Sequence, residues 1–264
     1  MYDFNYHKPD SIDEAIQLFL GAEDGIYLAG GHTLLPSMKQ RLAAPTDVID
    51  LAGIDGLSGI EDVGADIEIG ALTAHDEVAT SSVVQSGIPA LAELASLIGD
   101  AQVRNRGTIG GSVSNSDPAA DYPAGVLGLG AEIVTNKRTI AADDFFTAMF
   151  ETALEEGELL TKIKFPKPES AAYVKFPNPA SRYATVGVFI ALTGSGVRVA
   201  ITGAAPSVFR STDMEKALNS EFSVEALEGI TLDAGEMNSD LHATAEYRAH
   251  LCTVMAKRAV LKLL

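Results

Sequence analysis

The sequence predicts an α+β protein, and three of its features support this class. Before residue 55, a capped helix, a strand, a glycine pair, a second helix and another strand follow one another. The middle of the chain alternates short strands with helical segments, and the segment after residue 167 places successive strands before one long helix. Strands grouped before helices are typical of α+β domains. With 264 residues, 47% of them hydrophobic, the chain is long enough to bury a substantial core.

The first predicted unit, residues 1–55, is a small βαβ unit. In the segment SIDEAIQLF, Ser11 stands three residues before Glu14 and the apolar residues recur at helical spacing, which is typical of a capped amphipathic helix. In GIYLAGGHTLLPSMKQRL, we expect a strand over 26–29, a tight turn at the glycine pair and a helix over 34–42. TDVIDL is the next strand.

The second predicted unit, residues 56–166, is built from short strands and helical segments. ADIEIGA, AEIVT and ELLTKIKFP have the composition of strands, and helical segments are expected near 75–82 and 89–98. The charged, proline-containing break FPKPES indicates the boundary to a third unit, residues 167–264. In that unit, AAYVKFP, ATVGVFIAL and VRVAITGA are predicted as successive strands, and DLHATAEYRAHLCTVMAKRAVLKLL as a closing helix.

Composition excludes several classes of partner. With 36 acidic against 19 basic residues, the net charge is −17, which repels nucleic acid and anionic membrane surfaces. The start MYDFNYHKPD has no apolar signal core, and no run approaches the roughly 18 apolar residues of a membrane span, so we expect a cytoplasmic protein. A lone cysteine, Cys252, excludes an internal disulfide and a cysteine-built metal or iron–sulfur site within this chain.

The histidines and serines give no support to a metal site or a hydrolase triad. The five histidines show no metal-ligand spacing, and no serine lies in a G-x-S-x-G motif. Only His32, inside a glycine loop, is a candidate for a functional role. We expect His7, His75, His242 and His250 at the surface or at helix caps.

Two glycine pairs are the strongest functional signal. LAGGHT lies between a predicted strand and a helix, and GTIGGS follows a helix; the loops end in small hydroxyl residues, Thr33 and Ser112. Paired glycines permit positive φ angles and let consecutive backbone amides point into one concavity, which binds phosphate without formal positive charge. A single glycine pair is more often an ordinary turn, but the two phosphates of a dinucleotide need two such loops. Neither loop matches G-x-G-x-x-G or G-x-x-x-x-G-K-[ST], which disfavours ordinary NAD-binding and P-loop ATP-binding sites.

The stretch RNRGTIGGSVSNSDPAADYPA carries further candidates around the second loop. Arg104 and Arg106 could add local positive potential at its rim or shape the loop. Asp117 and Asp121 stand in a proline-containing corner, where a carboxylate could accept hydrogen bonds from ribose or ribityl hydroxyls or could simply form a turn. The residues alone therefore predict a protein that binds a phosphate-bearing dinucleotide through two glycine loops.

At these loops the chain resembles a known family. AGGHTLLPSMKQRLAAPTDVIDL and RNRGTIGGSVSNSDPAADYPA are similar to the two flavin-binding segments of the FAD-binding middle subunit of molybdenum hydroxylases, the carbon monoxide dehydrogenase and xanthine dehydrogenase family. The similarity extends through GALTAHDEV, ELLTKIKFP and YVKFPNPASRYATVGV, and it is weakest after about residue 205. It implies a p-cresol-methylhydroxylase type FAD-binding domain of two α/β subdomains (1–55 and 56–166), followed by a C-terminal α+β domain (167–264) whose sheet is covered by a closing helix.

The resemblance also implies which residues bind FAD. In this sequence they are Leu28, Ala29, Gly30, Gly31, His32, Thr33, Leu34, Leu35, Thr108, Ile109, Gly110, Gly111, Ser112, Asp121, Leu160 and Lys175. The FAD pyrophosphate would lie between the loops, with Gly110 and Gly111 exposing backbone donors and Asp121 reaching the hydroxyl-bearing chain of the flavin. Leu160 would contact the region of the ring, and Lys175 would bring a cation that suits the negative charge of reduced flavin.

One position departs from the family. Arg182 stands directly before Tyr183, where many relatives have an acidic residue. The departure concerns the immediate surroundings of the flavin ring, beside which Tyr183 could stack. A half-buried strand tyrosine is the more common role for such a residue.

The function implied by the resemblance is that of an FAD-carrying electron-transfer subunit. Such a chain receives electrons from the 2Fe-2S clusters of a small subunit, while a molybdopterin-binding large subunit oxidises the substrate, and it passes the electrons to an external acceptor within a hetero-oligomer. No catalytic side chain and no metal ligand is expected in this chain. Two alternatives remain open: a self-contained FAD-dependent reductase or oxidase of the same superfamily, and a non-redox nucleotide-binding assembly protein.

Overall fold

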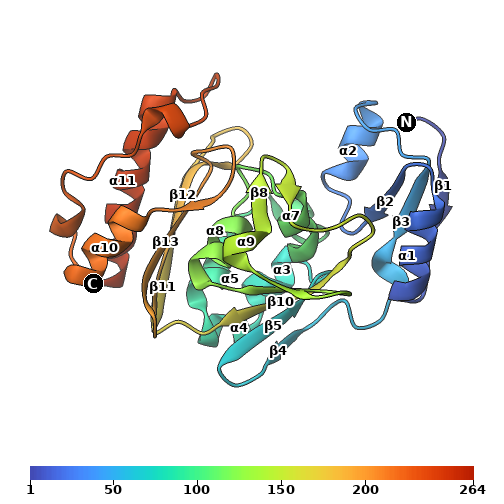
Figure 1. The fold of residues 1–264 in the computed structure, drawn as a ribbon, viewed down its shortest axis with the longest axis horizontal. Coiled ribbons are helices and arrows are strands. Elements are labelled where there is room, and N and C mark those ends of the chain that lie inside the picture. Colours follow the sequence, from blue (N-terminus) through green and yellow to red (C-terminus); the bar gives the residue numbers. More distant parts are fainter.

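The computed structural model describes residues 1–264 and arranges them in three units along the molecule (Figure 1). The N-terminal unit, drawn in blue, lies at one end, the C-terminal unit, drawn in orange and red, lies at the other, and the largest unit lies between them. Each unit contains its own sheet, and helices accompany the strands in all three. The predicted α+β class is confirmed.

A three-stranded parallel sheet with the order β1-β3-β2 forms the first unit. The first helix begins where expected, because the Ser11 hydroxyl accepts a hydrogen bond from the Glu14 amide. The second helix ends at Lys39 rather than at residue 42, since Arg41 adopts a left-handed φ of +62° that stops it. The elements are β1 (Asn5–His7), α1 (Ile12–Gly21), β2 (Gly25–Leu28), α2 (Leu34–Lys39), β3 (Asp47–Asp50) and the 3-10 helix η1 (Leu51–Gly53).

The second unit is built on a five-stranded antiparallel sheet with the order β4-β5-β10-β6-β7. The strand that comes last in the chain, β10, is therefore central, and its Ile163 and Phe165 are fully buried in the largest hydrophobic core. The strands are β4 (Ile60–Asp62), β5 (Asp66–Gly70), β6 (Glu132–Thr135), β7 (Thr139–Ala141) and β10 (Leu160–Pro166), and a separate hairpin joins β8 (Phe146–Ala148) to β9 (Glu151–Thr152). The helices are α3 (His75–Thr80), α4 (Ser82–Gly87), α5 (Pro89–Ser96), α6 (Ala101–Arg104), α7 (Ile109–Asn115), α8 (Tyr122–Leu129) and α9 (Ala142–Phe145).

Helix α8 joins the second unit to the third. All of its residues are buried, because it packs between the core of the second unit and strands β12 and β13 of the C-terminal sheet (Figure 1). A methyl group at Gly128 would lie 2.7 Å from a ring carbon of Phe189, so only glycine permits this approach. The C-terminal sheet therefore packs against α8, which follows the second glycine loop in the chain.

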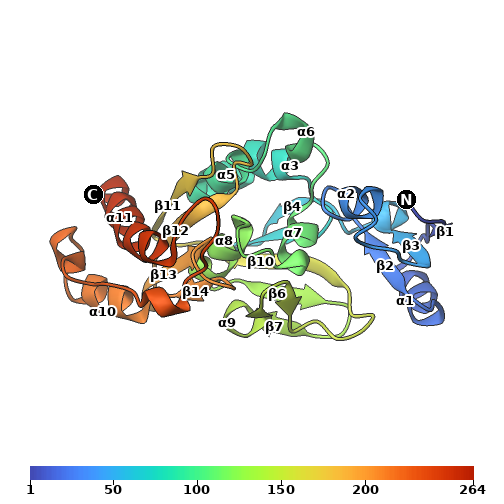
Figure 2. The ribbon, with the colours of Figure 1, turned by 90° about the horizontal axis from the view of Figure 1, so that it is seen from above.

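The third unit is a four-stranded antiparallel sheet with the order β11-β12-β13-β14. Helices α10 and α11 cover one face of this sheet, while α8 lies against the other (Figures 1 and 2). The closing helix begins after Thr244, whose hydroxyl accepts a hydrogen bond from the Tyr247 amide. The elements are β11 (Ser170–Pro177), β12 (Ala184–Thr193), β13 (Gly196–Thr202), β14 (Phe209–Arg210), α10 (Thr212–Ser220), α11 (Ala245–Leu263) and the 3-10 helices η2 (Glu225–Leu227) and η3 (Ala234–Glu236).

Two further features bear on the sequence analysis. None of the helices combines the length and the apolar character that crossing a membrane requires. Cys252 is fully buried in α11, and burial raises the pKa of its thiol to about 12, so it packs as a small apolar side chain.

Candidate functional site

The two glycine loops lie in contact. The first follows β2 and leads into α2, and the second connects α6 to α7 (Figure 2). A methyl group at Gly30 would lie 2.7 Å from the Gly107 Cα atom and closer still to the Arg106 carbonyl oxygen. Such an approach of one backbone to another requires glycine. The fold therefore brings together two segments from different units.

The first loop has unpaired backbone donors. The amides of five consecutive residues, Ala29 to Thr33, make no hydrogen bond within the protein, and Gly31 has a left-handed φ of +73°. Backbone amides of folded proteins are nearly always paired with protein groups, solvent or a ligand. Consecutive free amides around a left-handed glycine fit an anion such as phosphate.

The second loop does not expose the donors that we expected at Gly110 and Gly111. The Gly110 amide donates to the carbonyl oxygen of Ala71 at 2.8 Å, and the Gly111 amide donates to the Thr108 hydroxyl at 3.2 Å. That expectation was wrong because the first turn of α7 is bonded to the second unit and to its own N-cap. Gly110 is needed for packing, since a methyl group there would lie 2.6 Å from the Ala71 Cβ atom.

The remaining predicted residues of the second loop are also held from within. The Ile109 amide donates to Thr73 at 3.0 Å, and the Ser112 amide donates to Thr108 at 3.0 Å. The partly exposed hydroxyl of Ser112 forms no hydrogen bond in the protein, so it is the polar group that this loop leaves available. Leu160 is buried, and the carbonyl of the next residue, Thr161, accepts a hydrogen bond from Ala71, which ties Leu160 to the strand end that supports Gly110.

Asp121 and Lys175 form a buried ion pair. The Lys175 Nζ atom lies 2.9 Å from Asp121 Oδ2, and both side chains are only 4% exposed. The Tyr173 hydroxyl donates to the other carboxylate oxygen at 2.5 Å. Burial raises the pKa of Asp121, whereas the charge of Lys175 and the bond from Tyr173 lower it, and burial is the largest of these effects. Two N–H groups of Lys175 have acceptors in the protein, which leaves the third available.

Three cations bind the backbone carbonyl groups of residues 97–99, the turn that follows α5. Lys175 donates to Leu97 at 3.1 Å, Arg104 donates to Ile98 at 3.1 Å, and Arg182 donates to Gly99 at 3.1 Å. Positive charge is favourable at the carboxyl end of a helix, where the unpaired carbonyl groups gather. The role of Arg104 is therefore to hold this turn. Arg106 is exposed and its side chain has no partner.

His75 is a buried residue that sequence reasoning placed at the surface or at a cap. It is the first residue of α3 but only 5% exposed, because its ring packs under the second loop beside Gly107. Its Nδ1 atom has no hydrogen-bond partner, and neither has the hydroxyl of the neighbouring Tyr122. Burial, reinforced by the charges of His32 and Arg104, lowers the pKa of His75 to about 4.

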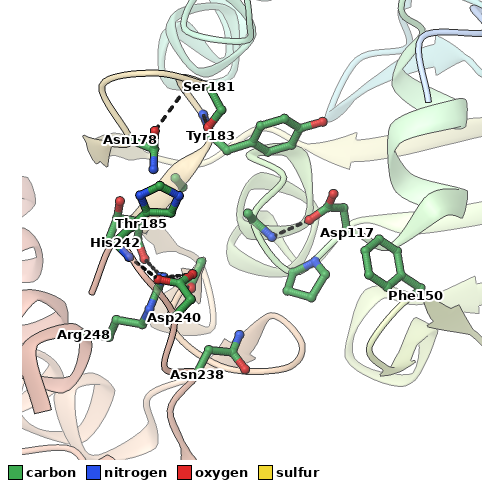
Figure 3. A pocket seen from close by; sticks show the side chains of 14 residues that line it. Asp117, Phe150, Asn178, Ser181, Tyr183, Thr185, Asn238, Asp240, His242 and Arg248 are labelled. Carbon is green, nitrogen blue, oxygen red and sulfur yellow. Dashed lines mark hydrogen bonds and ion pairs between the residues drawn. The ribbon is translucent and has the colours of Figure 1, made fainter. Parts of the chain in front are cut away.

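A cavity of about 300 Å³ lies between the second and third units (Figure 3). Asp117 and Phe150 line it from the second unit, and Tyr183, Asp240 and Arg248 line it from the third. The Arg248 guanidinium donates to two backbone carbonyl groups and to Asp240, so its charge is already neutralised. Burial is the main cause of the raised pKa values of Asp117 and Tyr183. The charges of Asp117 and Asp121 raise the pKa of Tyr183 further.

Two family patterns match almost the whole chain. The family described as "FAD binding domain in molybdopterin dehydrogenase" matches residues 2–168. The family described as "CO dehydrogenase flavoprotein C-terminal domain" matches residues 171–263.

Characterised relatives match over nearly their full length. The carbon monoxide dehydrogenase medium chain of Hydrogenophaga pseudoflava is 38% identical, over 97% of this chain and 96% of its own length. The nicotine 6-hydroxylase medium subunit of Paenarthrobacter nicotinovorans is 35% identical over the same shares. A solved structure of reconstituted CO dehydrogenase from Oligotropha carboxidovorans superposes with a TM-score of 0.90 at 36% identity, covering 98% of this chain and 96% of that one.

The buried pair allows a test by double substitution. We expect Lys175→Met to lower the free energy of unfolding by about 3 to 5 kcal/mol, because it leaves the Asp121 carboxylate buried without a cation. Adding Asp121→Asn should restore a large part of that loss, since no uncompensated charge then remains. Urea unfolding of the four proteins of the cycle measures this, and a double variant as unstable as Lys175→Met would contradict it.

His75 should make the protein less stable as the pH falls. Its folded pKa of about 4 lies below the ordinary value of 6.5. The contribution of neutral His75 to the free energy of unfolding is therefore complete above pH 6.5 and is lost as the pH falls towards 4. From this difference in pKa, the free energy of unfolding should fall by about 2 kcal/mol between pH 7 and about pH 5. His75→Gln, which cannot be protonated, should lack this part of the pH dependence in urea unfolding. Equal pH dependence in the two proteins would show that His75 is not held neutral.

Proposed function

Because the chain belongs to the family of FAD-binding medium subunits of molybdenum hydroxylases, which are oxidoreductase subunits, we propose that it carries FAD between its two glycine loops and transfers electrons from a partner subunit to an external acceptor. Residues 1–55 and 56–166 act as the two FAD-binding subdomains, and residues 167–264 as the C-terminal domain. The observation that carries the proposal is the row of free amides from Ala29 to Thr33, set against the second loop at Gly30.

The free amides suit the FAD pyrophosphate. In a chain of net charge −17, phosphate oxygens need donors that act at short range, and backbone amides supply them without formal charge. Residues Leu28 to Leu35 provide these donors and the surrounding apolar contacts. Residues Thr108 to Ser112 hold the facing wall through Gly110 and contribute the Ser112 hydroxyl. The first loop thus binds the phosphates, and the second positions the first.

Lys175, Asp121 and Leu160 serve the flavin end of the site. Bound FAD supplies the ability to accept and release electrons one or two at a time, and the protein tunes that ability by the charges around it. Lys175 offers one N–H group and a positive charge that favours negative charge developing beside it. Asp121 fixes the position of Lys175 and offers its carboxylate oxygens to hydroxyl groups. Leu160 belongs to the apolar wall.

The cofactors that this chain cannot hold indicate its partners. The carbon monoxide dehydrogenase and nicotine hydroxylase relatives are a medium chain and a medium subunit, so their complexes contain further chains. The one cysteine of this chain is buried in α11 and cannot hold an iron–sulfur cluster alone. We therefore assign the 2Fe-2S clusters to a small subunit and the molybdopterin cofactor to a large subunit of a hetero-oligomer.

FAD binding tests the site. We expect the wild-type protein, purified in its native complex or reconstituted with FAD, to contain about one FAD per chain. Gly30→Ala should reduce the FAD content at least about tenfold, because its methyl group displaces the loops from one another. Gly194→Ala is the matched control, since a methyl group there meets no atom within 4 Å. A folded wild-type protein that takes up no FAD would refute the proposal.

Co-purification tests the partners. A tagged form of the full chain, expressed in its native source, should bring down two further polypeptides together with molybdenum and iron in measurable, fixed ratios to FAD. The metals can be counted by mass spectrometry of the purified complex. If the tagged chain is isolated alone, and alone turns over a substrate, then the self-contained flavoenzyme is the correct alternative.

A further inference from the structure

One arginine in the hairpin between β11 and β12 holds a backbone conformation that favours glycine. Arg182 has a φ of +63°, which a side chain of its kind seldom adopts. The hairpin is nevertheless well bonded: the Asn178 amide donates to the Tyr183 carbonyl at 2.8 Å, and the Arg182 amide donates to the Asn178 carbonyl at 2.9 Å. The Arg182 side chain makes one further contact, which lies outside the hairpin.

That contact is the hydrogen bond from the Arg182 side chain to the Gly99 carbonyl. The contact joins residues 83 positions apart and belongs to the cluster of three cations at the carboxyl end of α5. The acceptor is a backbone carbonyl oxygen, which binds a guanidinium and offers an acidic side chain no donor. The bond fastens the hairpin of the third unit to the second unit.

The residue that follows, Tyr183, depends on this fastening. Its side chain is 45% exposed and its hydroxyl forms no hydrogen bond, so no contact of its own polar group fixes the ring. Figure 3 shows the ring extending from the hairpin over the cavity on the side of Asp117. The amide of the next residue, Ala184, donates to the Ala119 carbonyl at 3.2 Å, which places Tyr183 close to the segment that carries Asp121.

We propose that Arg182 is a positioning residue, which anchors the hairpin to Gly99 and thereby holds the Tyr183 ring against the flavin at the Asp121–Lys175 end of the site. This inference rests on the proposed FAD-binding function. The anchor itself is a property of the protein without FAD, and it can be measured separately.

The first experiment examines the anchor by amide hydrogen exchange in the protein freed of FAD. Arg182→Asn keeps a residue that tolerates a left-handed φ but cannot reach Gly99. A hydrogen bond from a charged group contributes enough that its loss should speed exchange of the amides of residues 180–183 about tenfold, after correction for intrinsic rates. Arg182→Lys should give an intermediate rate.

A matched control comes from Arg41, which also has a left-handed φ, of +62°, and lies at the end of α2. Arg41→Asn removes the same charge from the same backbone conformation, and it should leave exchange in the hairpin unchanged. If Arg182→Asn also leaves the hairpin unchanged, the anchor does not exist and the proposal is overturned.

The second experiment examines the position of the Tyr183 ring by the fluorescence of bound FAD. A tyrosine stacked on a flavin quenches its emission, so Tyr183→Leu and Arg182→Asn should both raise the emission per bound FAD several-fold, while Arg41→Asn should not. FAD content is counted from absorbance after denaturation. Normal content with unchanged emission in Arg182→Asn would overturn the proposal. Wild-type protein without FAD would overturn the proposed function instead, and the exchange experiment would still decide whether Arg182 holds the hairpin.

Discussion

The carbonyl groups left unpaired at the end of helix α5 set the arrangement of the site. Leu97, Ile98 and Gly99 need donors, and the chain supplies three cations from separate segments to meet them. One of these cations, Lys175, also neutralises the buried carboxylate of Asp121. In a protein with only 19 basic residues, this concentration of positive charge is a local arrangement that opposes the mean field. Lys175 and Arg182 belong to the third unit, so this unit cannot move away from the second without removing the cations from the Leu97 and Gly99 carbonyl groups and from the Asp121 carboxylate. The relative position of the two units is therefore coupled to the electrostatics of the site.

The two glycine loops have different physical tasks, although their sequences look alike. The amides of the first loop are free, whereas amides of the second loop donate hydrogen bonds to Thr108 at the helix cap and to Ala71 at the end of a strand. Gly30 and Gly110 are both sites of close backbone approach, but Gly30 faces the other loop and Gly110 faces its own unit. A glycine pair in a sequence therefore indicates that another group approaches the backbone closely. Only the fold shows whether that group is a ligand or another part of the protein.

Much of the fold could be predicted from the sequence, because the deciding interactions are local. The helix after Ser11 is set by its cap, the third unit by alternating apolar strands, and the family by two long motifs. Helix α8 was missed since burial on all sides leaves it no amphipathic period. The burial of His75 and the partner of Arg104 were missed for another reason: a backbone carbonyl or a loop stacked above a ring has no signature in sequence. The early end of α2 follows from one dihedral angle at Arg41, which no residue pattern announces.

The contact of Gly30 with the backbone of Arg106 and Gly107 has a thermodynamic consequence. The free amides of Ala29 to Thr33 belong to the first unit and the facing loop belongs to the second, so the proposed phosphate site is complete only while these two units are in contact. A ligand that binds only the docked form stabilises docking by mass action, in proportion to the logarithm of its concentration over its dissociation constant. FAD bound at the proposed site would therefore act as a removable crosslink that adds to the apolar cluster already shared by the two units, and its loss would weaken their contact.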